Sequence, residues 1–116
     1  MGIESYEKNG IFVVKICEER LDASTAPDFK NYVLDFVSKG KTRILLDLGK
    51  VDFIDSSGLG AIVTVLKRIS GSGDLCICNP TEPVKNMFKL TRMERVFRIF
   101  NSEEEAVEEM CSAYEG

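Results

Sequence analysis

Short apolar runs alternate with amphipathic helical patterns along this chain, and that alternation limits the folds available to it. The strand-like runs lie at residues 11–17, 43–48, 75–78 and 96–100. Apolar residues recur at helical spacing in four segments, which precede Gly40, follow Leu59, surround Phe88 and follow Ser102. Strands joined through helices form β-α-β units with right-handed crossovers. We therefore expect an α/β fold with one open, mixed sheet of four or five strands and about four helices.

Local turn and capping signals sharpen this prediction near the N-terminus. Asn9-Gly10 is a strong hairpin turn signal, so residues 3–8 are expected to pair with the strand at residues 11–17. Ser24 or Thr25 can cap the first helix, because both side chains accept hydrogen bonds from backbone N–H groups. The pattern does not decide whether the helices cover one face of the sheet or both faces in part.

The composition predicts one globular domain that covers residues 1–116. Hydrophobic residues make up 44% and charged residues 29%, which is enough apolar material for one core. The net charge of −4 argues against nucleic acid or an anionic membrane as the main partner, since both bind basic surfaces. No apolar run approaches the roughly 20 residues of a membrane span, and the first residues lack the features of a signal peptide. A cytoplasmic, bacterial-type setting is therefore expected.

The chain contains no histidine, which removes the commonest general base and the commonest zinc ligand. A hydrolase that needs a histidine base cannot be built from it. The cysteines include Cys76 and Cys78, whose C-x-C spacing differs from the C-x-x-C of redox and zinc sites. In a strand these two side chains point to the same face, and we interpret them as small buried hydrophobes. No enzyme activity, metal ion or cofactor is predicted.

The stretch Asp55-Ser56-Ser57-Gly58-Leu59-Gly60 lies where an apolar run ends and a helical pattern begins. A helix start presents unpaired backbone N–H groups and the positive end of the helix dipole, which stabilise an anion such as a phosphoryl group. Capping alone explains one of these side chains, but not an acid, two hydroxyls and two glycines together. Each glycine costs about 1 kcal/mol relative to alanine in a helix. We interpret Gly58 and Gly60 as positions where another molecule approaches the backbone.

Two other motifs do not fit this chain. A nucleophile elbow requires G-x-S-x-G, but Ile54 and Asp55 stand two positions before the serines. Gly40-Lys41-Thr42 is similar to the end of a phosphate-binding P-loop, but Asp35 stands where the first glycine of that loop should lie. That segment also precedes its strand instead of following it. A binding function therefore fits the sequence better than hydrolysis.

Several blocks of this sequence resemble the anti-sigma factor antagonist family, also called the STAS domain. The blocks lie at residues 21–27, 44–48, 51–60 and 87–97, so the resemblance extends over nearly the whole chain. The D-S-S-G-L-G block, in its strand–turn–helix setting, is the most specific of them. The resemblance implies a single STAS-like domain that binds other proteins and is not an enzyme.

The resemblance also implies a phosphorylation-controlled partner switch. In that family, an anti-sigma factor that is also a serine protein kinase phosphorylates the first serine after the aspartate, which is Ser56 here. The unmodified antagonist captures the kinase and frees the sigma factor, and a PP2C-type phosphatase resets the modified form. Asp22 and Asp55 match acidic positions near the phosphorylated serine. The expected partner-binding residues are Asp22, Ser24, Asp55, Ser56, Ser57, Gly58 and Leu59.

Alternatives from other classes stay open at this point. Similar domains serve as accessory subunits of transport machinery or of other regulatory complexes, which dock without any phosphate cycle. A nucleotide-binding module is a third option. The sequence identifies neither the kinase, the sigma factor nor the stimulus, and it leaves the oligomeric state open.

Overall fold

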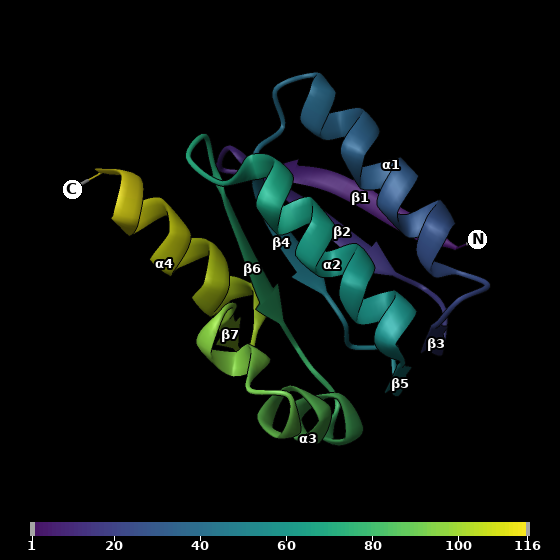
Figure 1. The fold of residues 1–116 in the computed structure, drawn as a ribbon. Helices are drawn as coiled ribbons and strands as arrows, with labels where there is room; N and C mark the ends of the chain where they lie inside the picture. Colours follow the sequence, from purple (N-terminus) through teal and green to yellow (C-terminus); the bar gives the residue numbers. More distant parts are fainter. Residues whose placement is uncertain (1, 116) are drawn as a thin grey trace.

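The computed structural model describes residues 2–115 as an α/β fold in which strands and helices alternate as the sequence predicts (Figure 1). The strands are β1 (Ile3–Lys8), β2 (Ile11–Ile16), β3 (Arg20–Leu21), β4 (Arg43–Asp47), β5 (Phe53–Ile54), β6 (Asp74–Cys78) and β7 (Arg98–Phe100). The helices are α1 (Ala26–Ser38), α2 (Ser56–Ile69), α3 (Glu82–Leu90) and α4 (Glu103–Glu115), with the short 3₁₀ helix η1 (Met93–Arg95) between α3 and β7. The prediction of about four helices is confirmed.

The main sheet is five-stranded, with the strand order β1-β2-β4-β6-β7. β1 and β2 form an antiparallel hairpin, and the other neighbours are parallel, so the sheet is mixed as predicted. The hairpin turn has positive φ angles at Asn9 (53°) and Gly10 (80°), which is the conformation that an Asn-Gly pair favours. β3 and β5 form a separate two-stranded parallel sheet that the sequence pattern did not predict.

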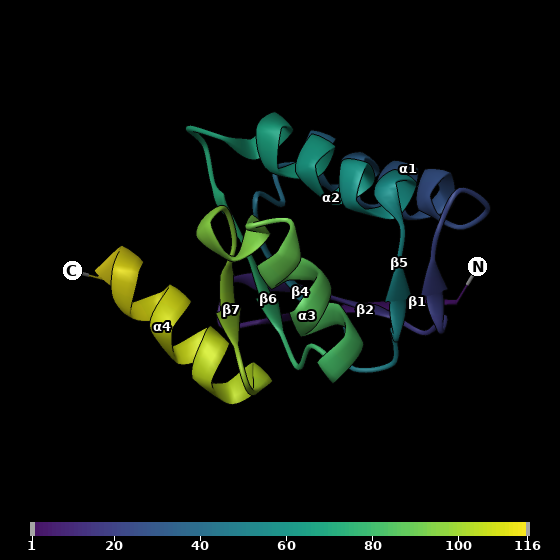
Figure 2. The same cartoon turned by 60° about the horizontal axis from the view of Figure 1, so that its bottom comes forward.

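Helices cover both faces of the main sheet, which decides the point that the sequence left open. α1 and α2 lie on one face, and α4 lies on the other (Figure 2). Side chains alternate between the faces along each strand, so Phe12 and Val14 join the large core beneath α1 and α2. Ile11 and Val13 join a smaller core beneath α4. Burial on both faces explains why the central strands read as nearly continuous apolar runs.

The two cysteines of β6 behave as core residues. Cys76 and Cys78 both belong to the smaller core beneath α4, as their C-x-C spacing predicts. Burial raises the pKa of each thiol to about 12, so both thiols stay protonated near neutral pH. Cys17 and Cys111 are half-buried, and all four cysteines are free. A protonated, buried thiol is a poor nucleophile and a poor metal ligand.

The last strand is shorter than predicted, because it begins at Arg98 and not at Val96. The N–H groups of Val96 and Phe97 both donate to the carbonyl of Met93 in η1, at 2.9 and 3.1 Å. These two amides close a local turn, so they do not pair with β6. Val96 is consequently exposed, whereas the ring of Phe97 is buried beside the ring of Phe88.

Candidate partner-binding site

Asp55 caps α2 and places two serines at the start of that helix. Its backbone is extended, and its carboxylate oxygen Oδ1 accepts the N–H of Gly58 at 2.9 Å. Ser56 and Ser57 are the first two residues of α2, and both are exposed. The N–H groups of a first helical turn have no acceptor within the helix. Those of Ser56 and Ser57 are therefore available to an anion.

The first turn of α2 differs in charge from the first turns of the other α-helices. α1 carries Asp28 there, α3 carries Glu82, and α4 carries three glutamates. Across residues 2–115, α2 is the one α-helix whose first turn contains no acidic residue. At the start of α2, the capping residue Asp55 thus carries the carboxylate that the first turn itself lacks. A further negative group at this helix start would be stabilised by the dipole.

The two glycines of the motif have different roles, and for Gly58 the predicted role is wrong. Gly58 is buried, and a Cβ atom built on it would lie 2.1 Å from the carbonyl oxygen of Leu21 and 2.9 Å from Cγ2 of Ile54. The close approach at Gly58 is therefore made by this chain's own backbone and not by another molecule. A Cβ atom on Gly60 would meet nothing within 4 Å, and Gly60 is exposed. Gly60 remains a position where a partner can approach the helix.

The small β3–β5 sheet brings Asp22 beside Asp55. Leu21 is the register partner of Ile54, and the N–H of Asp55 donates to the carbonyl of Leu21 at 3.3 Å. Because the two strands are parallel, the residues that follow them emerge at the same edge. Two carboxylates, from segments far apart in the sequence, therefore lie next to the start of α2.

Hydrogen bonds hold the Asp22 carboxylate in its ionised form. It accepts the hydroxyl of Ser24 at 2.7 Å, the N–H of Ser24 at 3.0 Å and Nε of Arg20 at 3.2 Å. The bonds from Ser24, with that from Arg20, lower the pKa of Asp22 to about 2. The guanidinium of Arg20 also lies over the exposed ring of Phe53, 4.1 Å from its centroid. Ser24 thus orients Asp22 instead of capping α1. Thr25 stands at the N-cap position of α1, but its side chain makes no capping hydrogen bond, so the predicted side-chain cap is wrong.

A hollow of about 330 Å³ lies between α1 and α2, beside Ser57. Its lining combines small side chains with one cation: Ala23, Ala26, Pro27, Lys30, Ser57, Gly60, Ala61 and Thr64. Of these, the sequence prediction included only Ser57 among partner-binding residues. The sequence could not group the others with Ser57, because the contact between α1 and α2 is tertiary, although small residues at the facing positions are a usable signal. Leu59 is half-buried and packs against the large core, so much of its side chain faces inward.

Two further observations describe what residues 2–115 do not contain. No helix in this range is both long enough and apolar enough to cross a membrane. No group of three or more His, Cys, Asp or Glu side chains in the same range is arranged to hold a metal ion.

Comparison with known proteins identifies the family. The family model of the STAS domain matches residues 2–106. A Thermotoga maritima protein, provisionally named as an anti-sigma factor antagonist, is 38% identical over 100 residues, which cover 84% of this chain and 88% of the relative. The chain belongs to the STAS domain family, as its sequence blocks predicted. Within that family, it is similar to proteins named as anti-sigma factor antagonists.

Solved structures of antagonists share the fold. A Thermotoga maritima crystal structure under the same provisional name matches with a TM-score of 0.84 at 35% identity, over 93% of each chain. The antagonist SpoIIAA of Bacillus is known in an unphosphorylated and a phosphorylated form. Each form matches with a TM-score of 0.71 at 18% identity, over 93% of this chain. At that identity, the SpoIIAA comparison shows the fold alone.

Proposed function

We propose that this protein is an anti-sigma factor antagonist whose binding is controlled by phosphorylation of Ser56. The unmodified form binds an anti-sigma factor that is also a serine protein kinase, and this binding releases a sigma factor for transcription. Phosphorylation of Ser56 by the same kinase ends the binding, and a PP2C-type phosphatase restores it. The protein acts in the cytoplasm as a binding partner and catalyses no reaction itself.

The position of Ser56 carries this proposal. Its hydroxyl is on an exposed residue, directly after the capping Asp55, at the start of the one described α-helix without a first-turn acid. A kinase can reach Ser56 without unfolding the helix, because Ser56 is exposed in the folded domain. The partner-binding residues proposed around it are Asp22, Ser24, Asp55, Ser57 and Leu59. Gly58 supports them from beneath through its contact with Leu21.

A phosphate on Ser56 is compatible with the folded domain. It adds about −1.5 to −2 charges at pH 7, at a helix start that stabilises a negative group by about 0.3–1 kcal/mol. The free N–H groups of Ser56 and Ser57 can donate to its oxygens. The two SpoIIAA forms, which match this chain equally well, support a STAS fold that is retained after modification.

The same phosphate would weaken a tight complex. The Asp22 carboxylate is ionised at pH 7, since both its ordinary pKa of 3.8 and its lowered pKa of about 2 lie far below that pH. It lies next to Asp55 through the β3–β5 pairing. A phosphate would add to this cluster of negative charge within a surface that the partner must desolvate. Like charges brought together in an interface cost several kcal/mol, and each 1.4 kcal/mol is about tenfold in affinity.

The direct test combines a kinase assay with a binding assay. The protein is incubated with ATP and the cognate anti-sigma factor kinase, and mass spectrometry locates the phosphate. We expect modification of Ser56 in the natural protein and none in the variant Ser56→Ala. We also expect Ser56→Ala to remain bound to the kinase in the presence of ATP, whereas the natural protein is released.

Ser57→Ala provides the matched control, because Ser57 is the adjacent exposed hydroxyl on the same helix turn. It should still be phosphorylated and released. Modification of Ser57 alone would place the switch one residue further on. Stable binding to a transport protein, with no phosphate transfer from any kinase, would instead favour the accessory-subunit alternative.

A further inference from the structure

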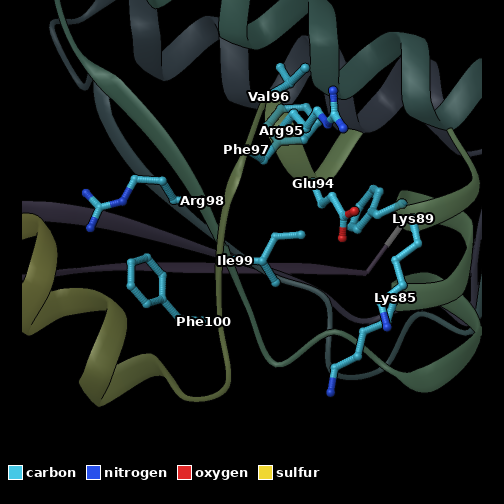
Figure 3. Close-up of a pocket in the computed structure, with 10 residues that line it drawn as sticks. Lys85, Lys89, Glu94, Arg95, Val96, Phe97, Arg98, Ile99 and Phe100 are labelled. Atoms are coloured by element: carbon cyan, nitrogen blue, oxygen red, sulfur yellow. The ribbon is translucent and has the colours of Figure 1, made fainter. Parts of the chain in front are cut away.

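A hollow lies between α3, η1 and β7, and we call it the α3–β7 hollow (Figure 3). It has a volume of about 530 Å³, within the range of about 300–1,000 Å³ that is typical of ligand sites. Phe88 and Phe97 form a buried aromatic floor. The rest of the lining consists of Lys85, Lys89, Glu94, Arg95, Val96, Arg98, Ile99 and Phe100. The hollow therefore combines an apolar floor with a largely basic rim.

The charge of this region is opposite to that of the whole chain. Residues 81–100 carry a net charge of +3, whereas the chain carries −4. Lys85 makes an ion pair with Glu82 at 3.5 Å, and both side chains are partly exposed. Within residues 2–115, neither Lys89 nor Arg95 makes an ion pair. The rim thus offers cations whose charge is not balanced inside the molecule.

The hollow opens beside an edge of the main sheet. β7 is the last strand in the order β1-β2-β4-β6-β7, so β6 is its one neighbour in that sheet. The Phe100 carbonyl accepts the N–H of Asn79 at 3.1 Å, which directs Phe100 toward β6. Backbone groups alternate in direction along a strand. The N–H and carbonyl of Ile99 therefore point toward the open edge.

Successive side chains of β7 point to opposite faces of the main sheet. Ile99 points toward Lys85 and Lys89, while Arg98 and Phe100 point away toward α4 (Figure 3). Arg98 makes a long, exposed ion pair with Glu109, at 3.7 Å, and its guanidinium lies 5.2 Å from the centroid of the Phe100 ring. A strand added beside β7 would therefore place alternate side chains over the α3–β7 hollow and beside Arg98.

We propose that the open edge of β7 and the α3–β7 hollow bind an extended, acidic segment of a partner protein as an added β-strand. Main-chain hydrogen bonds to Ile99 supply part of the affinity, and the hollow selects side chains at alternate positions. Charge complementarity identifies the occupant, because unbalanced lysine and arginine side chains surround an apolar floor. A second copy of this chain is a poorer occupant, since pairing two β7 edges would bring like cations together.

This surface is distinct from the Ser56 site. β7 forms one end of the main sheet, whereas α2 packs against α1 and its first residues follow β5 of the separate β3–β5 sheet (Figures 1 and 2). α3 contacts β5, but the residues that line the hollow do not include any residue of the Ser56 site. The proposal does not depend on the partner switch. It allows a third protein to be held while the Ser56 site is occupied or released.

The test uses a model peptide and amide NMR spectroscopy. The full chain, labelled with ¹⁵N, is titrated with an acetylated octapeptide that alternates glutamate and valine. We expect saturable shifts at the amides of Ile99 and Lys89 and none at Ser56. The variant Lys89→Glu/Arg95→Glu should weaken the binding by at least about tenfold. The matched control Lys67→Glu/Arg68→Glu, which reverses two exposed cations at the end of α2, should change it by less than about twofold.

Two further peptides separate strand pairing from simple charge attraction. The same octapeptide, N-methylated at every residue so that neither of its edges can donate to β7, should bind about tenfold more weakly. A lysine–valine octapeptide should not bind. The Ser56→Asp variant should bind the glutamate–valine peptide as the natural chain does, which separates this proposal from the partner switch.

Several outcomes would overturn the proposal. One is the absence of shifts at Ile99 at peptide concentrations up to about 1 mM. Another is equal binding of the peptide by the Lys89→Glu/Arg95→Glu variant. A third is binding of phosphatidylglycerol vesicles or duplex DNA at this surface in place of the peptide. Concentration-dependent shifts at Ile99 without peptide would assign the edge to a second copy of the chain.

Discussion

The starts of α2 and α4 use the same capping principle but treat charge in opposite ways. In α2, the Asp55 carboxylate accepts the N–H of Gly58 at 2.9 Å, and in α4 the Ser102 hydroxyl accepts the N–H of Glu105 at 3.1 Å. The first turn of α4 then carries three glutamates, whereas the first turn of α2 carries none. Both helices are capped, but only α4 balances its dipole with its own first-turn side chains.

The acids of α4 are also used inside the molecule. Glu103 accepts a hydrogen bond from the hydroxyl of Tyr6 and forms an ion pair with Lys8 at 3.4 Å, which ties α4 to β1. The corresponding position in α2 is Ser56, which is exposed. A helix start that is filled by internal contacts serves the fold. A helix start left open to solvent is available for a modification and for a partner.

The largest expected effect concerns binding at the open helix start. Ser56→Asp should weaken binding to the anti-sigma factor by about a hundredfold, which is about 2.7 kcal/mol, because it places a further negative charge beside Asp22 and Asp55. Isothermal titration calorimetry measures the affinity, and thermal unfolding checks that the fold is retained. Ser70→Asp, at the other end of α2, is the matched charge control and should bind normally. Equal affinity of the natural protein and Ser56→Asp would contradict the electrostatic switch.

The next effect tests why the third residue of α2 is a glycine, where the third residue of α4 is Glu105. Gly58→Ala should lower the free energy of unfolding by about 2–3 kcal/mol, because its Cβ would lie 2.1 Å from the Leu21 carbonyl oxygen. Gly60→Ala should instead raise it by about 0.5–1 kcal/mol, since no atom lies within 4 Å of that Cβ. Urea unfolding of both variants measures the difference. Similar stabilities for the two variants would mean that the Leu21 contact relaxes easily.

A smaller effect on stability is expected when either of the two helix caps is removed. Asp55→Ala and Ser102→Ala should each lower the free energy of unfolding by about 1 kcal/mol, because each removes one hydrogen bond to a first-turn N–H. Asp55→Asn should retain most of the stability, as asparagine is an equally good cap. Urea unfolding again provides the measurement. A much larger loss for Ser102→Ala would mean that the α4 cap holds more of the structure than its single bond indicates.

The smallest expected effect is the dependence of stability on pH that Asp22 confers under acidic conditions. The hydrogen bonds from Ser24 lower the pKa of Asp22 from 3.8 to about 2 in the folded state. A lowered folded-state pKa stabilises the protein above the unfolded value, and this contribution is lost as the pH falls from about 4 to about 2. In the Asp22→Asn variant, the melting temperature should therefore fall less steeply as the pH is lowered over this range. Asp28→Asn removes a nearby carboxylate without these hydrogen bonds, and an equally reduced slope in that variant would contradict the assignment.

Much of the fold was predictable because the signals are local. Asn9-Gly10 predicts the β1–β2 hairpin, and the spacing of Cys76 and Cys78 predicts that both face one core. The Asp55 cap and the start of α2 follow from neighbouring residues in the same way. The start of β7 was harder to predict, since the amides of Val96 and Phe97, which the strand pattern assigned to β7, donate to the Met93 carbonyl in η1.

The order of apolar and polar residues, by itself, determined the sequence of strands and helices and the position of Ser56 at a helix start, because periodicity and capping act over a few residues. Only the tertiary structure decided that helices cover both faces of the sheet and that the Leu21–Ile54 pairing sets Asp22 beside Asp55. It also decided that Gly58 is required by the Leu21 carbonyl, and that a basic hollow borders the free edge of β7. These features join segments distant in the sequence, and their contacts depend on how complete elements pack.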